Sequence, residues 1–321
     1  MKPQKFPQPS IHETTRIADP ALSALYAGAI LEKVRRRRGR LSHGRGLPGG
    51  AVVVRHPGIG TERLESYRRL VKGEVFDGVH RLALPSVLVH IMAFPGQMSL
   101  LASEDFPLPL MGMVHLGNAV EHRRPLAADS PVQIRTWTEG LRAHRRGTQF
   151  DVITEVLTED ADVEAPADQD LLWQETSTYL SRGTHLAGVA SEESRSVARE
   201  EFAPPRKTAQ WHLDADIGRR YASVSGDWNP IHLSSLSAKA LGMRSAIAHG
   251  MYAAGRMLEG REPQQAGHRW SIRFEAPIRL PGTVAFGARS TASDDEVTVA
   301  FSGWDPRTGR RHFSGELARP D

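Results

Sequence analysis

The sequence predicts an α+β fold built from two copies of one module, each an antiparallel sheet wrapped around a central helix. Two observations lead to this fold class. Residues 84–102 are apolar almost all round, which is typical of a helix buried inside a protein. In addition, a buried helix followed by about four strand-like runs occurs twice along the chain, as a duplication predicts.

The first copy is expected at residues 51–182. A short strand is predicted at 51–55, and Pro95 must kink or end the helix at 84–102, because proline lacks the N–H that a helix interior requires. The acidic stretch 158–170, which holds no basic residue, is interpreted as a solvated loop. Further strands are expected from their β-branched and apolar residues at 113–116, 132–138, 148–157 and 171–180.

The second copy is expected at residues 208–321, after a linker at 183–207. A local similarity supports the duplication, because strands begin at Val132 and Val284, each seven residues after a proline, Pro125 and Pro277. The elements expected in this copy are helices at 234–241 and 250–259 and strands at 269–276, 283–291, 295–304 and 311–318.

The composition is that of a globular protein and excludes cysteine chemistry. The chain has no cysteine, so disulfides, thiolate nucleophiles and the zinc or iron–sulfur sites that need cysteine sulfur are ruled out. No close spacing of histidines and acidic residues indicates a metal site, and we expect none. No run reaches the ~18 apolar residues of a membrane helix, and residues 1–9 lack the apolar core of a secretory signal. We therefore expect a cytoplasmic protein without a membrane partner.

The basic charge is concentrated in a leader at residues 1–50, which carries ten Lys or Arg against three acidic residues. A helix is predicted at 20–38, followed by a glycine-rich loop at 39–50. The arginines at 35–38 and 40 are most simply a solvated tail or helix end. They could also meet phosphates of coenzyme A or an acidic carrier protein, or form a nucleic-acid arm. No RNA-recognition motif accompanies them, so we expect no nucleic-acid partner.

A carboxylate, a carboxamide and an imidazole lie within six residues, at Asp227, Asn229 and His232. Gly226 permits a tight turn before them and Pro230 fixes the backbone after Asn229. Such a loop can direct its polar side chains toward one point, which acid–base catalysis requires. Asp227 and His232 are the candidate catalytic pair.

A second candidate feature begins at His249 and Gly250, which open an apolar helix. A helix N-terminus presents free N–H groups and the positive end of the helix dipole. Glycine there lets a ligand approach the backbone. A thioester oxygen that becomes enolate-like is the kind of charge that such N–H groups stabilise.

Residues 221–258 resemble the MaoC-like dehydratases, the (R)-specific or type-2 enoyl-CoA hydratases, in their Gly-Asp-x-Asn-Pro-x-His and Ala-His-Gly-Met elements. The strand order up to residue 318 fits the hot-dog fold of that family. Residues 51–182 resemble, by pattern, the degenerate first hot dog of double-hot-dog members. Because this half has no Asp-x-Asn-Pro-x-His, the resemblance implies one active site per chain, with the first half serving as the acyl pocket.

The resemblance also implies a reaction, the reversible dehydration of a (3R)-hydroxyacyl thioester to a trans-2-enoyl thioester, without metal or redox cofactor. Asp227 and His232 match the catalytic pair, and Asn229 matches the amide beside them. Gly250 lies where the thioester oxygen meets a helix N–H. The implied partner is an acyl thioester of coenzyme A or of acyl carrier protein. Two modules in one chain already form the pseudo-dimer of this fold, so both a monomer and a homodimer are compatible with it.

Each site residue also has a plain structural explanation. Asp227 could cap the turn, His232 could be a satisfied loop histidine, and Asn229 could brace the backbone. His249 is taken as structural by default, although it could face the substrate, and Tyr221 is expected to form a pocket wall. The combination of the loop with the helix at Gly250 favours the catalytic interpretation.

Two rival functions remain open on the same fold. A thioesterase would use similar residues to direct water at C1 of the acyl group rather than at C3, and a non-catalytic acyl-thioester-binding protein would need no proton transfer. The paired Asp227 and His232 favour the lyase, because hydration needs two complementary proton handlers around one water.

Overall fold

The computed structural model describes residues 13–17, 46–72, 83–110, 112–186, 202–263, 267–293 and 295–320, with the single residues 22, 25 and 189. The helix expected at 20–38 and the arginines at 35–40 therefore lie outside the described residues, apart from positions 22 and 25. By their contacts the residues group into two compact units. Unit 1 comprises Met1–His56, Ala93–Val114 and Pro131–Glu193, and unit 2 comprises Pro57–Met92, His115–Ser130 and Ser194–Asp321.

Unit 1 is a sheet of strands in the order β1-β2-β4-β5-β6. All described neighbours are antiparallel except β1 and β2, which run parallel. The strands are β1 (Glu13–Ile17), β2 (Gly50–His56), β4 (Val132–His144), β5 (Gly147–Thr158) and β6 (Leu171–Arg182). The acidic loop expected at 158–170 joins β5 to β6 and contains only a short 3₁₀ turn at Asp168–Asp170.

Several buried polar side chains in unit 1 pair with one another. Arg135 and Glu155 form a buried ion pair. The amide of Gln97 donates to Thr154 Oγ1 at 3.1 Å and to the Glu175 carboxylate. These pairs satisfy groups that would otherwise be costly to bury. The role of this half as an acyl pocket remains a prediction.

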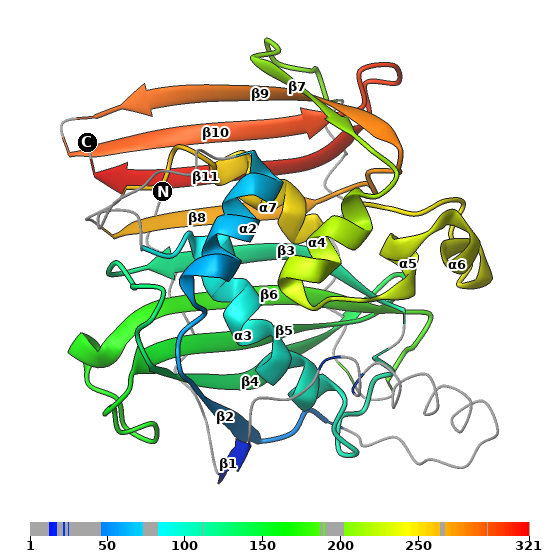
Figure 1. Cartoon of the computed structure of the whole chain (residues 1–321). Coiled ribbons are helices and arrows are strands. Elements are labelled where there is room, and N and C mark those ends of the chain that lie inside the picture. Colours follow the sequence, from blue (N-terminus) through cyan, green and yellow to red (C-terminus); the bar gives the residue numbers. More distant parts are fainter. Residues whose placement is uncertain are drawn as a thin grey trace. The chain divides into compact units, whose positions relative to one another are not determined.

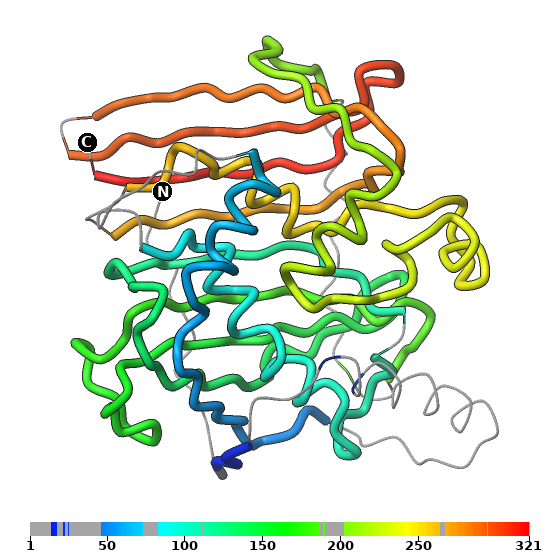
Figure 2. The backbone as a smooth tube through the Cα atoms, viewed as in Figure 1, coloured from blue at the N-terminus to red at the C-terminus, as the bar shows by residue number. Residues whose placement is uncertain are grey.

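Unit 2 is a sheet in the order β7-β9-β10-β11-β8-β3, with antiparallel neighbours throughout. The helices α2, α4 and α7 lie on one side of its strands (Figure 1). The strands are β3 (Met113–His122), β7 (Ala209–Leu213), β8 (His268–Phe274), β9 (Gly282–Ala292), β10 (Glu296–Trp304) and β11 (Arg311–Pro320). The helices are α2 (Thr61–Val71), α4 (Ile217–Ser225), α5 (Pro230–Leu233), α6 (Ser235–Ala240) and α7 (Gly250–Leu258). Figure 2 traces the chain from α4 through α5 and α6 to α7.

The strand order supports a duplication. In unit 1 four successive neighbours are β2-β4-β5-β6, and in unit 2 the corresponding neighbours are β7-β9-β10-β11. The same spatial order arises twice from strands in the same chain order. The domain bounds 51–182, 183–207 and 208–321 stay a prediction, because grouping by contact does not follow the order of the chain.

The long buried helix is confirmed as α3 (Ser86–Leu101). Pro95 lies inside it and does not end it. Most of its side chains are buried, as its apolar surface predicts. Helix α2 was not predicted, although its buried residues Leu64, Tyr67, Leu70 and Val71 are mostly three apart, as on one helix face.

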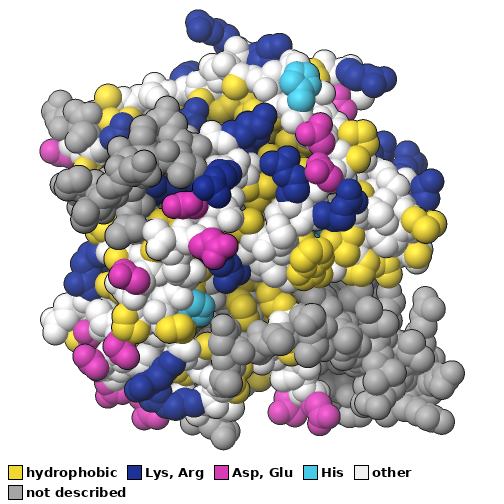
Figure 3. Space-filling model, in the orientation of Figure 1, with side chains coloured by type: hydrophobic (Ala, Val, Ile, Leu, Met, Phe, Trp, Pro, Cys, Tyr) yellow, Lys and Arg dark blue, Asp and Glu magenta, His cyan; other side chains and the backbone are white. Residues whose placement is uncertain are grey.

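Two observations concern the surface. None of the described helices is long and apolar enough to cross a membrane. On the face seen in Figure 3, Lys and Arg side chains are interspersed with Asp and Glu. A surface of mixed charge sign does not by itself indicate a polyanionic partner.

Candidate active site

The candidate site begins where α4 ends, in unit 2. Gly226 has φ 78°, a left-handed conformation that glycine adopts without strain, and its N–H donates to the Ala222 carbonyl at 2.8 Å. The Asp227 N–H then donates to Ser225 Oγ at 3.1 Å. The glycine predicted to allow a tight turn is therefore the residue that redirects the chain at Asp227.

Asp227 and Asn229 both brace the loop that carries them. Asp227 Oδ1 accepts from the Asn229 N–H at 3.2 Å, and Asn229 Oδ1 accepts from the Ile231 N–H at 3.3 Å. Asn229 thereby caps α5, whose first residue is Pro230, a favoured position for proline. One side-chain oxygen of Asp227 and the side-chain oxygen of Asn229 therefore have the structural role of bracing the turn. The amide nitrogen of Asn229 makes no hydrogen bond to any described residue.

A hydrogen bond to the backbone holds the ring of His232 through one of its nitrogens. Its Nδ1 lies 2.8 Å from the Ile247 carbonyl oxygen, which can only accept, so Nδ1 carries the proton and donates. The other nitrogen, Nε2, then bears a lone pair. Burial lowers the pKa of the imidazole below its ordinary value, while Asp227 and the Ile247 carbonyl oppose that shift. The geometry therefore supplies a neutral imidazole with a basic nitrogen.

His249 contacts both catalytic candidates. Its Nε2 donates to the Asp227 backbone carbonyl at 3.1 Å and lies 3.6 Å from Asp227 Oδ2. Its ring stacks on His232 with centroids 3.7 Å apart and packs at a tilt against Tyr221, with centroids 4.6 Å apart. The pKa of His249 is lowered to about 3, chiefly by burial and to a lesser extent by the nearby His232. Tyr221 lies against His249 as a buried wall.

Gly250 is the first residue of α7, with His249 as its N-cap. A Cβ on Gly250 would come within 2.8 Å of the Phe274 ring. Phe274 therefore accounts for the need for glycine, and the close approach expected of a ligand is made here by an aromatic side chain. The assignment of the Gly250 N–H to a thioester oxygen remains a prediction.

Comparisons with known proteins agree with the sequence resemblance. The family model described as MaoC like domain matches residues 197–299. The 3-hydroxyacyl-thioester dehydratase X of Mycobacterium tuberculosis is 35% identical over 263 residues, which cover 81% of this chain and 84% of that protein. The chain belongs to the MaoC-like dehydratase family.

Solved structures confirm the fold of this MaoC-like protein. A crystal structure of HtdX from Mycobacterium tuberculosis has a TM-score of 0.64 at 27% identity, with 83% of this chain and 98% of that chain covered. A MaoC-like dehydratase from Phytophthora capsici has a TM-score of 0.63 at 15% identity, with 86% and 96% covered, a similarity of fold alone. The predicted α+β, double-hot-dog fold is confirmed.

Sequence reasoning missed two contributors to the site of this MaoC-like protein. His115, on β3, contacts the Phe274 ring at a centroid distance of 5.2 Å, and the Asp227 charge acts on its imidazole. The pKa of His115 is lowered to about 3, chiefly by burial and to a lesser extent by the nearby His90. Gly218, on α4, packs so closely on the His232 carbonyl that a Cβ would overlap it. No spacing signal links residues more than a hundred positions apart, so only the fold reveals His115.

Two groups of side chains in the described part of this MaoC-like protein have the residue types and spacing to hold a metal ion. One is Asp227, His232 and His249, and the other is His122, Glu262 and His268. In each group, one polar atom per residue lies within 4.8 Å of the others. In the first group both histidines already donate to backbone carbonyls, so a metal would have to use their remaining nitrogens.

Proposed function

We propose that this chain catalyses the reversible dehydration of (3R)-3-hydroxyacyl thioesters to trans-2-enoyl thioesters, as a hydro-lyase. Membership of the MaoC-like family and the 35% identity to a protein named 3-hydroxyacyl-thioester dehydratase X support the reaction class. One observation carries the mechanism, namely the buried neutral His232 with Nδ1 committed to Ile247 and Asp227 beside it.

His232 is the proton carrier in this proposal. Its Nε2 takes the α-proton from C2 of the hydroxyacyl thioester, and the C2=C3 bond forms as the hydroxyl leaves C3. The imidazolium returns that proton to the hydroxyl, and one water is released, so atoms and charge balance. Asp227 stabilises the imidazolium, consistent with its raising of the His232 pKa, and accepts a hydrogen bond from the hydroxyl. Hydration runs through the same steps in reverse.

The remaining site residues position the substrate. The Gly250 N–H, at the start of α7, is the proposed donor to the thioester oxygen, which gains charge when the α-proton leaves. The Asn229 amide nitrogen is available to the water or hydroxyl, because its oxygen is committed to Ile231. His249 stacks on the catalytic imidazole, and Tyr221 packs in turn against His249.

The substrate is an acyl thioester of coenzyme A or of acyl carrier protein. Either carrier presents the same thioester to Asp227 and His232. Assembly into a homodimer remains a prediction from the sequence.

The decisive experiment follows the enoyl absorbance of crotonyl-CoA and of a longer enoyl-CoA during incubation with the protein. Hydration predicts loss of this absorbance, formation of the (3R)-3-hydroxyacyl product and no free thiol. Release of coenzyme A thiol with the enoyl group intact would instead identify a thioesterase. Binding of both thioesters without any turnover would identify a non-catalytic protein, and either of these outcomes would overturn the proposal.

A further inference from the structure

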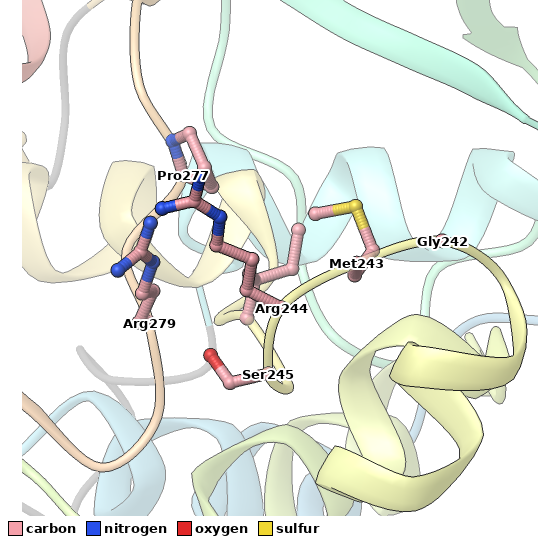
Figure 4. A pocket seen from close by; sticks show the side chains of 7 residues that line it. Gly242, Met243, Arg244, Ser245, Pro277 and Arg279 are labelled. Carbon is pink, nitrogen blue, oxygen red and sulfur yellow. The ribbon is translucent and has the colours of Figure 1, made fainter.

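A pocket of about 150 Å³ opens next to the residue that orients His232. Its lining includes two arginines, Arg244 and Arg279, together with Ile247. We call it the Arg pocket; the rest of its lining is Gly242, Met243, Ser245 and Pro277. Figure 4 shows both arginine side chains at the same end of the pocket.

The backbone fixes the two arginines relative to the catalytic loop. Arg279 forms an antiparallel bridge with Ile247, flanked by hydrogen bonds from Ala248 N–H to the Ile278 carbonyl at 2.9 Å and from Leu280 N–H to the Ala246 carbonyl at 2.9 Å. The Ile247 carbonyl is the acceptor for His232 Nδ1. Arg244 lies three residues before Ile247, in the bend that leads into this bridge. The Arg pocket is therefore built onto the same short segment as the catalytic imidazole.

Among the described residues, no acidic side chain pairs with either guanidinium group. Neither Arg244 nor Arg279 makes a hydrogen bond or ion pair with a described residue, and both are exposed. Two like charges beside one pocket repel each other unless a ligand supplies negative charge. Guanidinium groups match phosphate oxygens in geometry and can bind them through two parallel hydrogen bonds. A pocket of this volume has room for a phosphate group.

We infer that Arg244 and Arg279 bind a phosphate of the pantetheine-bearing carrier of the acyl thioester. This inference rests on the proposed function and adds a carrier-recognition site to it. Coenzyme A and a holo carrier protein both have a phosphate at the end of the pantetheine arm, and coenzyme A has further phosphates on its nucleotide. Phosphate is therefore common to both carriers. Its binding in the Arg pocket is a separate event from the proton transfer at His232.

The test compares crotonyl-CoA, crotonyl-4′-phosphopantetheine and crotonyl-pantetheine, which has no phosphate, with wild-type protein, Arg244→Gln, Arg279→Gln and the double variant. Arg289→Gln is the matched control, because Arg289 is an exposed arginine on β9 and does not line the Arg pocket. We expect each pocket substitution to raise KM for crotonyl-CoA about 3- to 10-fold, and the double variant about 10- to 50-fold, with kcat within twofold. The effect should weaken in high salt.

The phosphate-free thioester separates the possible outcomes. Crotonyl-pantetheine should be turned over with a KM that none of the variants changes. If KM rises equally for crotonyl-pantetheine, or stays unchanged for crotonyl-CoA in the double variant, the inference is wrong. A rise shared by crotonyl-CoA and crotonyl-4′-phosphopantetheine identifies the phosphate on the arm, and a rise for crotonyl-CoA alone identifies a nucleotide phosphate.

A measurement of coenzyme A binding distinguishes a wrong assignment of the Arg pocket from a wrong proposed reaction. If no thioester is turned over, calorimetry with coenzyme A still compares the wild-type protein with the double variant. A loss of affinity of about 10-fold or more would support the Arg pocket without any catalysis. Equal affinities would overturn it.

Discussion

Unit 2 contains two clusters of two histidines and a carboxylate that differ in what their polar atoms contact. In the active-site cluster, Asp227, His232 and His249, each histidine donates from one nitrogen to a backbone carbonyl. In the buried cluster, His122, Glu262 and His268, the carboxylate is the hub. Glu262 Oε1 accepts from His268 Nε2 at 3.1 Å and from the Ser86 N–H at 2.8 Å.

The buried cluster ties α3 to the sheet. Ser86 is the first residue of α3, where N–H groups lack intrahelical partners, and Glu262 supplies one partner. Trp270, on β8, donates from Nε1 to Ser86 Oγ at 2.8 Å. The His122 and His268 rings lie 4.9 Å apart. The same residue types thus anchor a helix in one place and, in our proposal, transfer protons in the other.

The comparison teaches that residue type and spacing do not separate the two roles. In both clusters the histidines are buried and the carboxylate is partly buried, and both meet the distance requirement for a metal. The active-site cluster differs because its histidines are held by the backbone and its carboxylate lies on a turn beside a helix N-terminus. This difference leads to three expectations, from the largest effect to the smallest.

Substitutions in the two clusters should differ in their effect on hydration activity. Asp227→Asn and His232→Gln should each reduce kcat for enoyl-CoA hydration about 100-fold or more, because the first removes the charge that stabilises the imidazolium and the second removes the proton carrier. Glu262→Gln, the matched change in the buried cluster, should leave kcat within about twofold, since it touches no reacting group. Equal losses in Asp227→Asn and Glu262→Gln would contradict the division of roles.

Stability should show the opposite pattern. Glu262→Ala removes the acceptor of the Ser86 N–H and of His268, and should lower the free energy of unfolding by about 1–3 kcal/mol. Asp227→Asn keeps an oxygen for the Asn229 N–H, so its unfolding free energy should change by less than about 1 kcal/mol. Urea unfolding followed by circular dichroism measures both. A larger loss in Asp227→Asn would count against the anchoring role of Glu262.

The pH dependence of stability should separate the buried cluster from catalysis. The pKa of His122 is lowered from 6.5 to about 3, chiefly by burial and to a lesser extent by the nearby His268. Between these pH values the unfolded chain binds a proton that the folded chain does not, so the free energy of unfolding falls as pH falls from 6.5 toward 3. His122→Phe removes this contribution and should make the slope shallower by about 1.4 kcal/mol per pH unit. Hydration kcat should be unchanged, and an unaltered slope would argue against a neutral buried His122.

Much of the fold could be predicted from the sequence because its signals are local. The apolar surface of α3 and the β-branched runs of β4, β5, β9 and β10 predicted elements that the structure confirms. Pro95 was predicted to kink or end this helix, and the helix continues past it to Leu101. Helix α2 was missed, although its apolar spacing was available.

The candidate site was only partly predictable. The bracing of the Asp227–His232 loop follows from residues two apart, so the sequence could anticipate it. The stacking of His249 on His232 and the approach of Phe274 to Gly250 depend on segments that meet only after folding. For the same reason Arg244 and Arg279, 35 positions apart, give no signal as a pair.

The sequence by itself determined the two-module α+β architecture, the family resemblance and the loop that carries Asp227, Asn229 and His232. These features depend on periodicity and on neighbours a few residues apart, which a linear pattern records. The tertiary structure decided which nitrogen of His232 is committed, why position 250 must be glycine, and where the two arginines of the Arg pocket meet. Each of these depends on contacts between distant segments, and packing alone brings those segments together.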